Sequence, residues 1–93
     1  MGRTHKEQLE LKKEIETAKS KVTIGAQYYH YKGQDKVYQI IGLGFLEATD
    51  ELCVIYQAQY GEKLIFLRPL TIWLEKVEWE GKTVSRFTKI QTT

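Results

Sequence analysis

The sequence has few of the residues from which catalytic and metal sites are usually built. Its 93 residues include one cysteine and two histidines, so no intrachain disulfide can form and no His/Cys metal cluster can be assembled. Nor do the residues supply a catalytic triad or a phosphate-binding glycine loop. The longest apolar runs, 40–46 and 64–67, are well short of the ~20 residues that span a bilayer. We therefore expect a soluble, cytoplasmic protein with no membrane partner, no cofactor, no metal and no catalytic residue.

An excess of charge is also absent. Fourteen lysines and arginines face twelve acidic residues, which gives a net charge of +2. That excess lies in residues 1–21, whereas residues 22–93 carry eight charges of each sign. Domains that hold nucleic acid mainly through its phosphates are usually strongly basic. The near-neutral 22–93 segment therefore weakens the case for that class of protein.

The length leaves room for one globular domain, in which a helix over residues 1–21 precedes a β-rich part over 22–93. Cys53, the lone cysteine, lies within an apolar stretch and has no basic neighbour in sequence to favour its thiolate. We expect it to be a small buried hydrophobic residue rather than a catalytic or redox group.

The first segment has the pattern of an amphipathic helix. Thr4-His-Lys-Glu7 has the form of a capping box, which predicts that the helix begins there. A narrow apolar stripe follows at spacings of four, three and four residues. We expect this stripe to dock on the β-rich part or to pair with a second copy, and docking is favoured because isolated helices of this length are marginal. The stripe consists of Leu11, Ile15, Ala18 and Val22.

All eleven aromatic residues lie after position 27, where the apolar pattern changes to alternation. Residues 54–70 predict a hairpin with strands over 52–60 and 64–68, a turn at Tyr60–Lys63 and an end at Pro69. The first strand places one apolar face inward, formed by Leu52, Val54, Tyr56, Ala58 and Tyr60. Alternation predicts further strands over 25–31, 37–47, 73–79 and 83–87, with turns over 32–36 and 80–82, and a fraying tail over 88–93.

Two glycines interrupt the predicted strand over 37–47. Gly42 and Gly44 would weaken it unless they allow a bend, so we expect the sheet to curl there. Gly42 and Gly44 share one face of this strand, and the other face is predicted to hold Val37, Gln39, Ile41, Leu43 and Phe45. Five to six short antiparallel strands behind a leading helix predict a mainly β fold, a small curved SH3-like barrel.

Four separated motifs stand out along the β-rich part. They are Gly25-x-x-Tyr28-x-His30-Tyr31-Lys32-Gly33, Tyr38-x-Ile40, Val54-x-Tyr56-x-x-x-Tyr60-Gly61-Glu62 and Leu67-Arg68-Pro69-Leu70. In order and spacing these motifs resemble the family known as domain of unknown function 1653, and the similarity runs from about Gly25 to Phe87. The resemblance implies a small bacterial protein with an SH3-like β fold, and it implies no reaction.

The sequence departs from the family pattern at two places. A His-Ser-Glu type segment before the hairpin is replaced by Phe45-Leu-Glu-Ala-Thr49, and the proline before Arg-Phe is replaced by Ser85. Any role that the family gives to that histidine therefore does not transfer to this chain.

The segment Tyr28–Lys32 is the strongest candidate for a ligand site. Alternation separates Tyr29 and Tyr31 from His30, so the three consecutive side chains cannot all point inward. Exposed tyrosines beside Lys32, Lys36 and Arg68 can stack bases, clamp a peptide or hold a sugar ring. The alternative is that the tyrosines complete a small core and His30 is an ordinary sheet residue. The candidate ligand-binding residues are Tyr29, His30, Tyr31, Lys32 and Arg68.

Arg68 lies among apolar residues, where an unpaired half-buried charge is costly. It is expected either to pair with Glu62 or Glu75 or to meet an anionic ligand. Glu62 and Glu75 can also be interpreted as an acid/base pair, but no nucleophile accompanies them. This leaves a small hydrolase as the weakest interpretation.

We expect a non-enzymatic binding module, and the ligand that we favour is a protein or peptide. We also expect homodimerisation through the N-terminal helix. The alternative is single-stranded RNA or DNA, with Tyr29 or Tyr31 stacking on bases and Lys32, Lys36 and Arg68 following phosphates.

Overall fold

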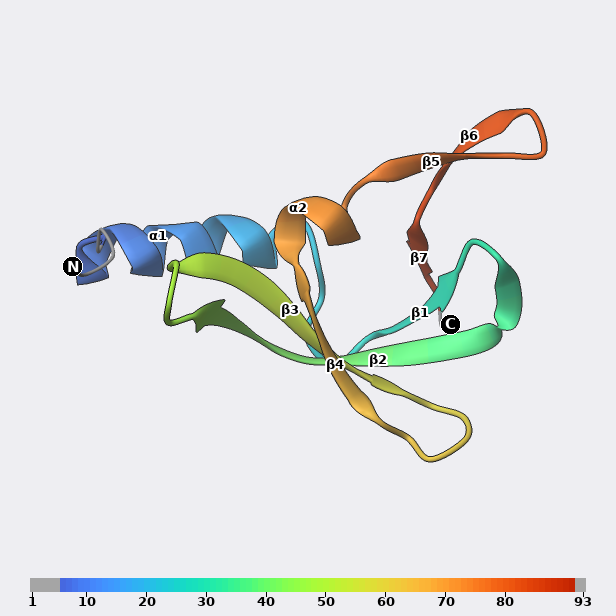
Figure 1. Cartoon of the computed structure of the whole chain (residues 1–93), viewed down its shortest axis with the longest axis horizontal. Helices are drawn as coiled ribbons and strands as arrows, with labels where there is room; N and C mark the ends of the chain where they lie inside the picture. The colour runs from blue at the N-terminus through green and yellow to red at the C-terminus, as the bar shows by residue number, and fades with distance from the viewer. Residues whose placement is uncertain (1–5, 92–93) are drawn as a thin grey trace.

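A computed structural model describes residues 6–91, which form one long helix, a curled antiparallel sheet of five strands and a separate two-stranded hairpin (Figure 1). The strand order of the sheet is β4-β3-β2-β1-β7, and β5 pairs with β6. The elements are α1 (Gln8–Lys19), β1 (Gln27–His30), β2 (Gly33–Leu46), β3 (Glu51–Ala58), β4 (Ile65–Pro69), α2 (Leu70–Trp73), β5 (Lys76–Trp79), β6 (Lys82–Ser85) and β7 (Phe87–Lys89).

The prediction of a mainly β fold behind an N-terminal helix is confirmed. Within the described residues the sheet remains open, since β4 and β7 each pair with one strand. The long β2 and β3 strands bend near their middles (Figure 1), where the register of their pairing shifts between Ile40 and Gly42. The expected curl near Gly42 is therefore present, and it arises from a β-bulge, which adds one residue to one strand and increases its twist.

The bulge changes which residues of β2 share a face, so the predicted face needs correction. Placing Ile41 on the same face as Leu43 and Phe45 is wrong, because one extra residue transfers the preceding part of the strand to the other face. Ile40 is fully buried whereas Ile41 is 45% exposed. The side chains that share the concave face with β3 are Tyr38, Ile40, Leu43 and Phe45.

Two local predictions also need correction. The turn over 32–36 is wrong, because β2 already starts at Gly33, which pairs with His30. The fraying tail is wrong for Thr88 and Lys89, because β7 forms the outer strand next to β1. The Ile90 N–H continues this pairing by donating to the Gln27 carbonyl at 2.9 Å. Long-range pairing thus stabilises a segment whose own sequence is polar.

The core lies on the concave face of the sheet. Pro69 ends β4, as predicted, and the short α2 that follows delivers Trp73 onto Phe87 with the rings stacked 3.8 Å apart at 7°. The predicted inner face of β3 is buried from Leu52 to Ala58, while Tyr60 beyond the strand is exposed. Cys53 is buried, and burial raises the pKa of its thiol. The central residues are Val22, Tyr28, Ile40, Val54, Tyr56, Trp73 and Phe87.

The start of α1 differs from the capping-box prediction. Thr4 lies outside the described residues, and Glu7 occupies the N-cap position with no hydrogen bond from its side chain to the helix. The segment before the helix is held instead by Asp50, whose buried carboxylate accepts the Lys6 backbone N–H at 2.9 Å. The end of the hairpin between β2 and β3 therefore fixes where the helix enters.

The apolar stripe of α1 docks on its own chain. Ala18 and Val22 are buried, and Val22 belongs to the central core. Leu11 and Ile15 nearer the helix start are half-buried. The helix is therefore anchored mainly at its C-terminal end.

We predict that Ala18→Asp lowers the free energy of unfolding by roughly 2 kcal/mol or more, because Ala18 is 1% exposed and a buried carboxylate without a partner is costly. The matched control is Leu9→Asp on the same helix, whose side chain is 66% exposed and which should change stability by less than roughly 0.5 kcal/mol. Urea denaturation followed by circular dichroism measures both. Equal stability of the two variants would show that the helix does not dock.

Candidate cationic–aromatic site

The curl of the sheet gathers side chains from β1, β2, β3, β4 and β7 around the ring of Phe87. The ring centroids of His30, Tyr38 and Tyr56 lie 5.3, 5.8 and 5.9 Å from that of Phe87. The Arg68 guanidinium carbon lies 5.5 Å from the same centroid. This group of residues is called the cationic–aromatic cluster below; it comprises His30, Tyr38, Tyr56, Arg68 and Phe87.

Arg68 is the half-buried cation of the cluster. Its Nε donates to the Tyr56 hydroxyl at 3.1 Å, and its charge lies over the electron-rich face of Phe87. Within residues 6–91 the side chain forms no ion pair, so the predicted partners Glu62 and Glu75 are both wrong. The terminal nitrogens of a guanidinium form a planar fork that suits a carboxylate or phosphate. The side chain is thus oriented by neutral groups, and its charge is not neutralised by a carboxylate of the described chain.

His30 is held as a neutral ring. Burial is the main factor that lowers its pKa, and the positive charges of Arg68, Lys32, Arg86 and Lys36 lower it further. The Lys32 N–H donates to His30 Nδ1 at 3.2 Å, so the neutral ring carries its proton on Nε2. His30 therefore offers one N–H donor beside an arginine.

The tyrosines extend the cluster toward the turn between β3 and β4. The hydroxyls of Tyr38 and Tyr60 hydrogen-bond to each other, and the Lys36 ammonium lies 5.3 Å from the Tyr60 ring centroid. Burial and this hydrogen bond raise the pKa of Tyr38, so its hydroxyl keeps its proton at neutral pH. The Tyr38 hydroxyl therefore adds a hydrogen-bonding group and no negative charge to the cluster.

Glu75 and Arg86 form an ion pair at one side of the cluster. Arg86 Nη2 lies 2.6 Å from Glu75 Oε1, and the Arg86 N–H donates to the Glu75 carbonyl at 3.1 Å. Glu62 precedes β4 whereas Glu75 lies beyond its other end, after α2, and Glu75 is already paired with Arg86. The suggested acid/base pair is therefore not assembled.

The structure brings together four of the five candidate residues. His30 and Arg68 belong to the cluster, and Tyr31 touches His30 with ring centroids 4.5 Å apart. Lys32 lies 5.8 Å from the Tyr31 centroid. Tyr29 is separated from them, because its neighbour Tyr28 points into the core and alternation directs Tyr29 to the opposite face.

Several neighbours were missed by the sequence reasoning. The sequence assigns Phe87 only to a strand end and Tyr38 only to a family motif, and it places Tyr60 in the 52–60 strand and its turn without linking it to the site. Tyr31 also meets Trp79 from the distant β5–β6 hairpin, with centroids 5.3 Å apart. The register of β2 against β3 places Tyr38 and Tyr56 on the same face of the sheet. The β-bulge between Ile40 and Gly42 interrupts the alternation from which this placement could be predicted.

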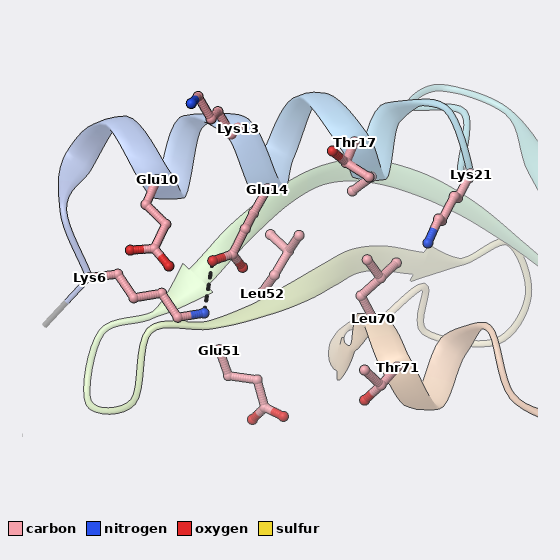
Figure 2. Close-up of a pocket in the computed structure, with 11 residues that line it drawn as sticks. Lys6, Glu10, Lys13, Glu14, Thr17, Lys21, Glu51, Leu52, Leu70 and Thr71 are labelled. Atoms are coloured by element: carbon pink, nitrogen blue, oxygen red, sulfur yellow. Dashed lines mark hydrogen bonds and ion pairs between the residues drawn. The ribbon is translucent and has the colours of Figure 1, made fainter. Parts of the chain in front are cut away.

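A second concave feature lies between α1, β3 and α2 (Figure 2). This groove has a volume of about 490 Å³, with Leu52 and Leu70 on its apolar floor. An ion pair between Lys6 and Glu14, 2.8 Å long, crosses one end (Figure 2). The groove contains none of the five candidate residues, and its rim carries charges of both signs. It therefore favours no particular class of ligand.

The cluster combines cationic, hydrogen-bonding and aromatic groups. In the part of the chain that the structure describes, no group of three or more His, Cys, Asp or Glu side chains could hold a metal ion. None of the described helices is long and apolar enough to cross a membrane. An arginine fork, a neutral histidine donor and tyrosine hydroxyls on an aromatic base are suited to binding an anionic group attached to an apolar body.

These features define a small, mainly β protein with an open curled sheet and a cationic–aromatic cluster. The chain belongs to the family described as protein of unknown function (DUF1653), whose family model matches residues 26–89. It is similar to the crystal structure of a DUF1653 protein from Bordetella bronchiseptica, with 29% identity and a TM-score of 0.67 over 78% of this chain and 94% of that chain. No curated protein matches. The family-matched segment includes the whole cluster, and α1 precedes it.

We predict that Arg68→Gln raises the pKa of His30 toward its ordinary value of 6.5, because Arg68 is the first of the charges that lower it. The native pKa lies below that of the unfolded chain, so the unfolded state takes up the proton first and stability falls as the pH drops below about 6.5. Arg68→Gln should make this fall smaller. NMR titration of the His30 ring measures the pKa, and Lys82→Gln is the charge-matched control. A His30 pKa that is the same in both variants would contradict the arrangement.

Proposed function

We propose that the protein is a non-enzymatic binding module that recognises a protein or peptide segment carrying a carboxylate. Arg68 would bind the carboxylate, His30 would donate a further hydrogen bond, and the aromatic rings would contact the apolar part of the ligand. Tyr31 and Lys32 would contact the segment at the edge of the cluster. The observation that carries the proposal is Arg68 itself, which is positioned by Tyr56 and Phe87 and has no carboxylate partner in residues 6–91.

The electrostatic balance supports an anionic ligand. Four cations act on His30, and the one ion pair that involves any of them within the described chain joins Arg86 to Glu75. A carboxylate beside Arg68 would relieve this concentration of positive charge and would raise the pKa of His30. The ligand is expected to carry few negative charges, since residues 22–93 are neutral overall.

Single-stranded nucleic acid is the second candidate, and one observation favours it. The ring of Tyr31 meets the exposed Trp79 edge-on, with Lys32 above Tyr31. Aromatic rings beside a cation can stack a base and hold a phosphate. The near-neutral charge of the chain places this candidate second.

We further propose a fold type and a cellular location for the protein. The curled sheet would be an open relative of the SH3-like barrel, supported by the bulge beside Gly42 and by the approach of Arg68 on β4 to Phe87 on β7. A bacterial, cytoplasmic protein would keep its lone buried cysteine reduced.

The test is selection from a random library of short linear peptides, followed by affinity measurement with the selected peptides. We predict enrichment of peptides that combine Asp, Glu or a free C-terminus with apolar residues. Arg68→Gln should weaken binding roughly tenfold or more, because hydrogen bonds to charged groups are the strong ones. Arg68→Lys should recover only part of the affinity, since it keeps the charge and loses the planar fork.

Two controls separate the interpretations. Lys82→Gln removes one charge from the exposed end of the β5–β6 hairpin and should leave affinity unchanged. A thymidine homopolymer serves as the nucleic-acid probe. Tight homopolymer binding that falls steeply with salt, together with a peptide selection that enriches no acidic group, would replace the proposal with the second candidate.

A further inference from the structure

The edge strand β4 and the residue before it present four consecutive apolar side chains to solvent. Their exposed fractions are 59% for Leu64, 56% for Ile65, 41% for Phe66 and 59% for Leu67. In the described chain β4 pairs with β3 alone, so its other edge has no strand beside it. Figure 1 shows the β3–β4 hairpin projecting away from α1 and from the β5–β6 hairpin. Proteins usually protect such an edge with charge, proline or a bulge, so a long apolar edge marks a contact surface.

The pairing with β3 shows which backbone groups are available. The Ala58 N–H donates to the Leu64 carbonyl at 3.0 Å, so the backbone groups of Leu64 point toward β3. Those of successive strand residues alternate in direction. The N–H and C=O of Ile65 and Leu67 therefore point to the free edge.

The ends of this free edge limit what can pair with it. Pro69 has no N–H to donate. Lys63 has a φ of 55°, so the chain before β4 turns away from an extended conformation. The edge thus offers two residues, Ile65 and Leu67, with Phe66 between them.

We propose that this edge binds the same edge of a second copy, which forms a two-fold antiparallel β4–β4 interface. Pairing Ile65 of one copy with Leu67 of the other makes four backbone hydrogen bonds, two at each end, and places the two Phe66 side chains beside each other on the symmetry axis. A shift that pairs Ile65 with Ile65 brings Lys63 into the ladder, and a shift that pairs Leu67 with Leu67 brings in Pro69. The segment is therefore complementary to itself in one register.

The charges agree with this register. Arg68 of one copy lies opposite Leu64 of the other, so the two arginines do not face each other. The turn that precedes β4 carries Glu62 and Lys63 and comes to the end of the interface where the second copy carries Arg68. Arg68 has no carboxylate partner within residues 6–91, and Glu62 of the second copy offers it one near that end. A two-fold contact of this kind closes on itself and gives a dimer rather than a fibre.

Sedimentation equilibrium of the full chain tests the interface. The expected mass is twice the 10.9 kDa of one chain, and Leu67→Lys should weaken dimerisation at least tenfold. Leu9→Lys is the control, because Leu9 is 66% exposed on α1 and lies outside the interface. A wild-type monomer, or a dimer that Leu67→Lys leaves intact, would overturn the proposal. A dimer lost in Leu9→Lys and kept in Leu67→Lys would assign the contact to the helix instead.

Amide hydrogen exchange gives a second readout that does not depend on a variant. In the dimer the Ile65 and Leu67 amides should exchange slowly, and so should the Phe66 amide, which lies in the ladder with β3. Fast exchange at Ile65 and Leu67 beside slow exchange at Phe66, under conditions where the mass is that of a dimer, would contradict β4 pairing.

Discussion

The contacts of the Phe87 ring are the feature on which both the core and the candidate site depend. One contact is the stack with Trp73, which fixes α2 over the sheet, and the others are edge contacts with His30, Tyr38 and Tyr56. Phe87 starts β7, at one edge of the sheet, and Arg68 of β4, at the other edge, reaches the same ring. Because the sheet curls, residues from its two edges meet, although the strands themselves do not pair.

This arrangement makes a half-buried arginine tolerable. A charge taken out of water needs polar or aromatic groups around it. The Tyr56 hydroxyl and the Phe87 face supply these groups without cancelling the charge. The neutral state of His30 follows first from its burial and then from the same positive charges, which lower its pKa further. The core aromatics and the proposed ligand site are therefore one structure, and substitutions of Phe87 should affect both.

The sequence was sufficient for features that depend on neighbouring residues. Gly61 and the alternation of 52–58 determine the β3–β4 hairpin, and the spacing of Ala18 and Val22 identifies the docked face of α1. The sequence was insufficient where contacts between distant segments determine the structure. One extra residue near Ile41 reversed the predicted face of a strand, and the pairing of Thr88 with Tyr29 across the chain made a strand from a polar tail. Arg68 was identified, but its surroundings come from four other strands and could not be read locally.

The account predicts that Arg68 is held against Phe87 in the free protein, before any ligand binds. Nuclear Overhauser effects between the Arg68 side-chain protons and the ring protons of Phe87 test this most directly. We expect clear cross-peaks to the Phe87 ring and ring-current shifts of the Arg68 side-chain protons, since the guanidinium carbon lies 5.5 Å from the ring centroid. Arg68 side-chain shifts typical of a free arginine, with no cross-peak to Phe87 in an otherwise folded protein, would contradict the account.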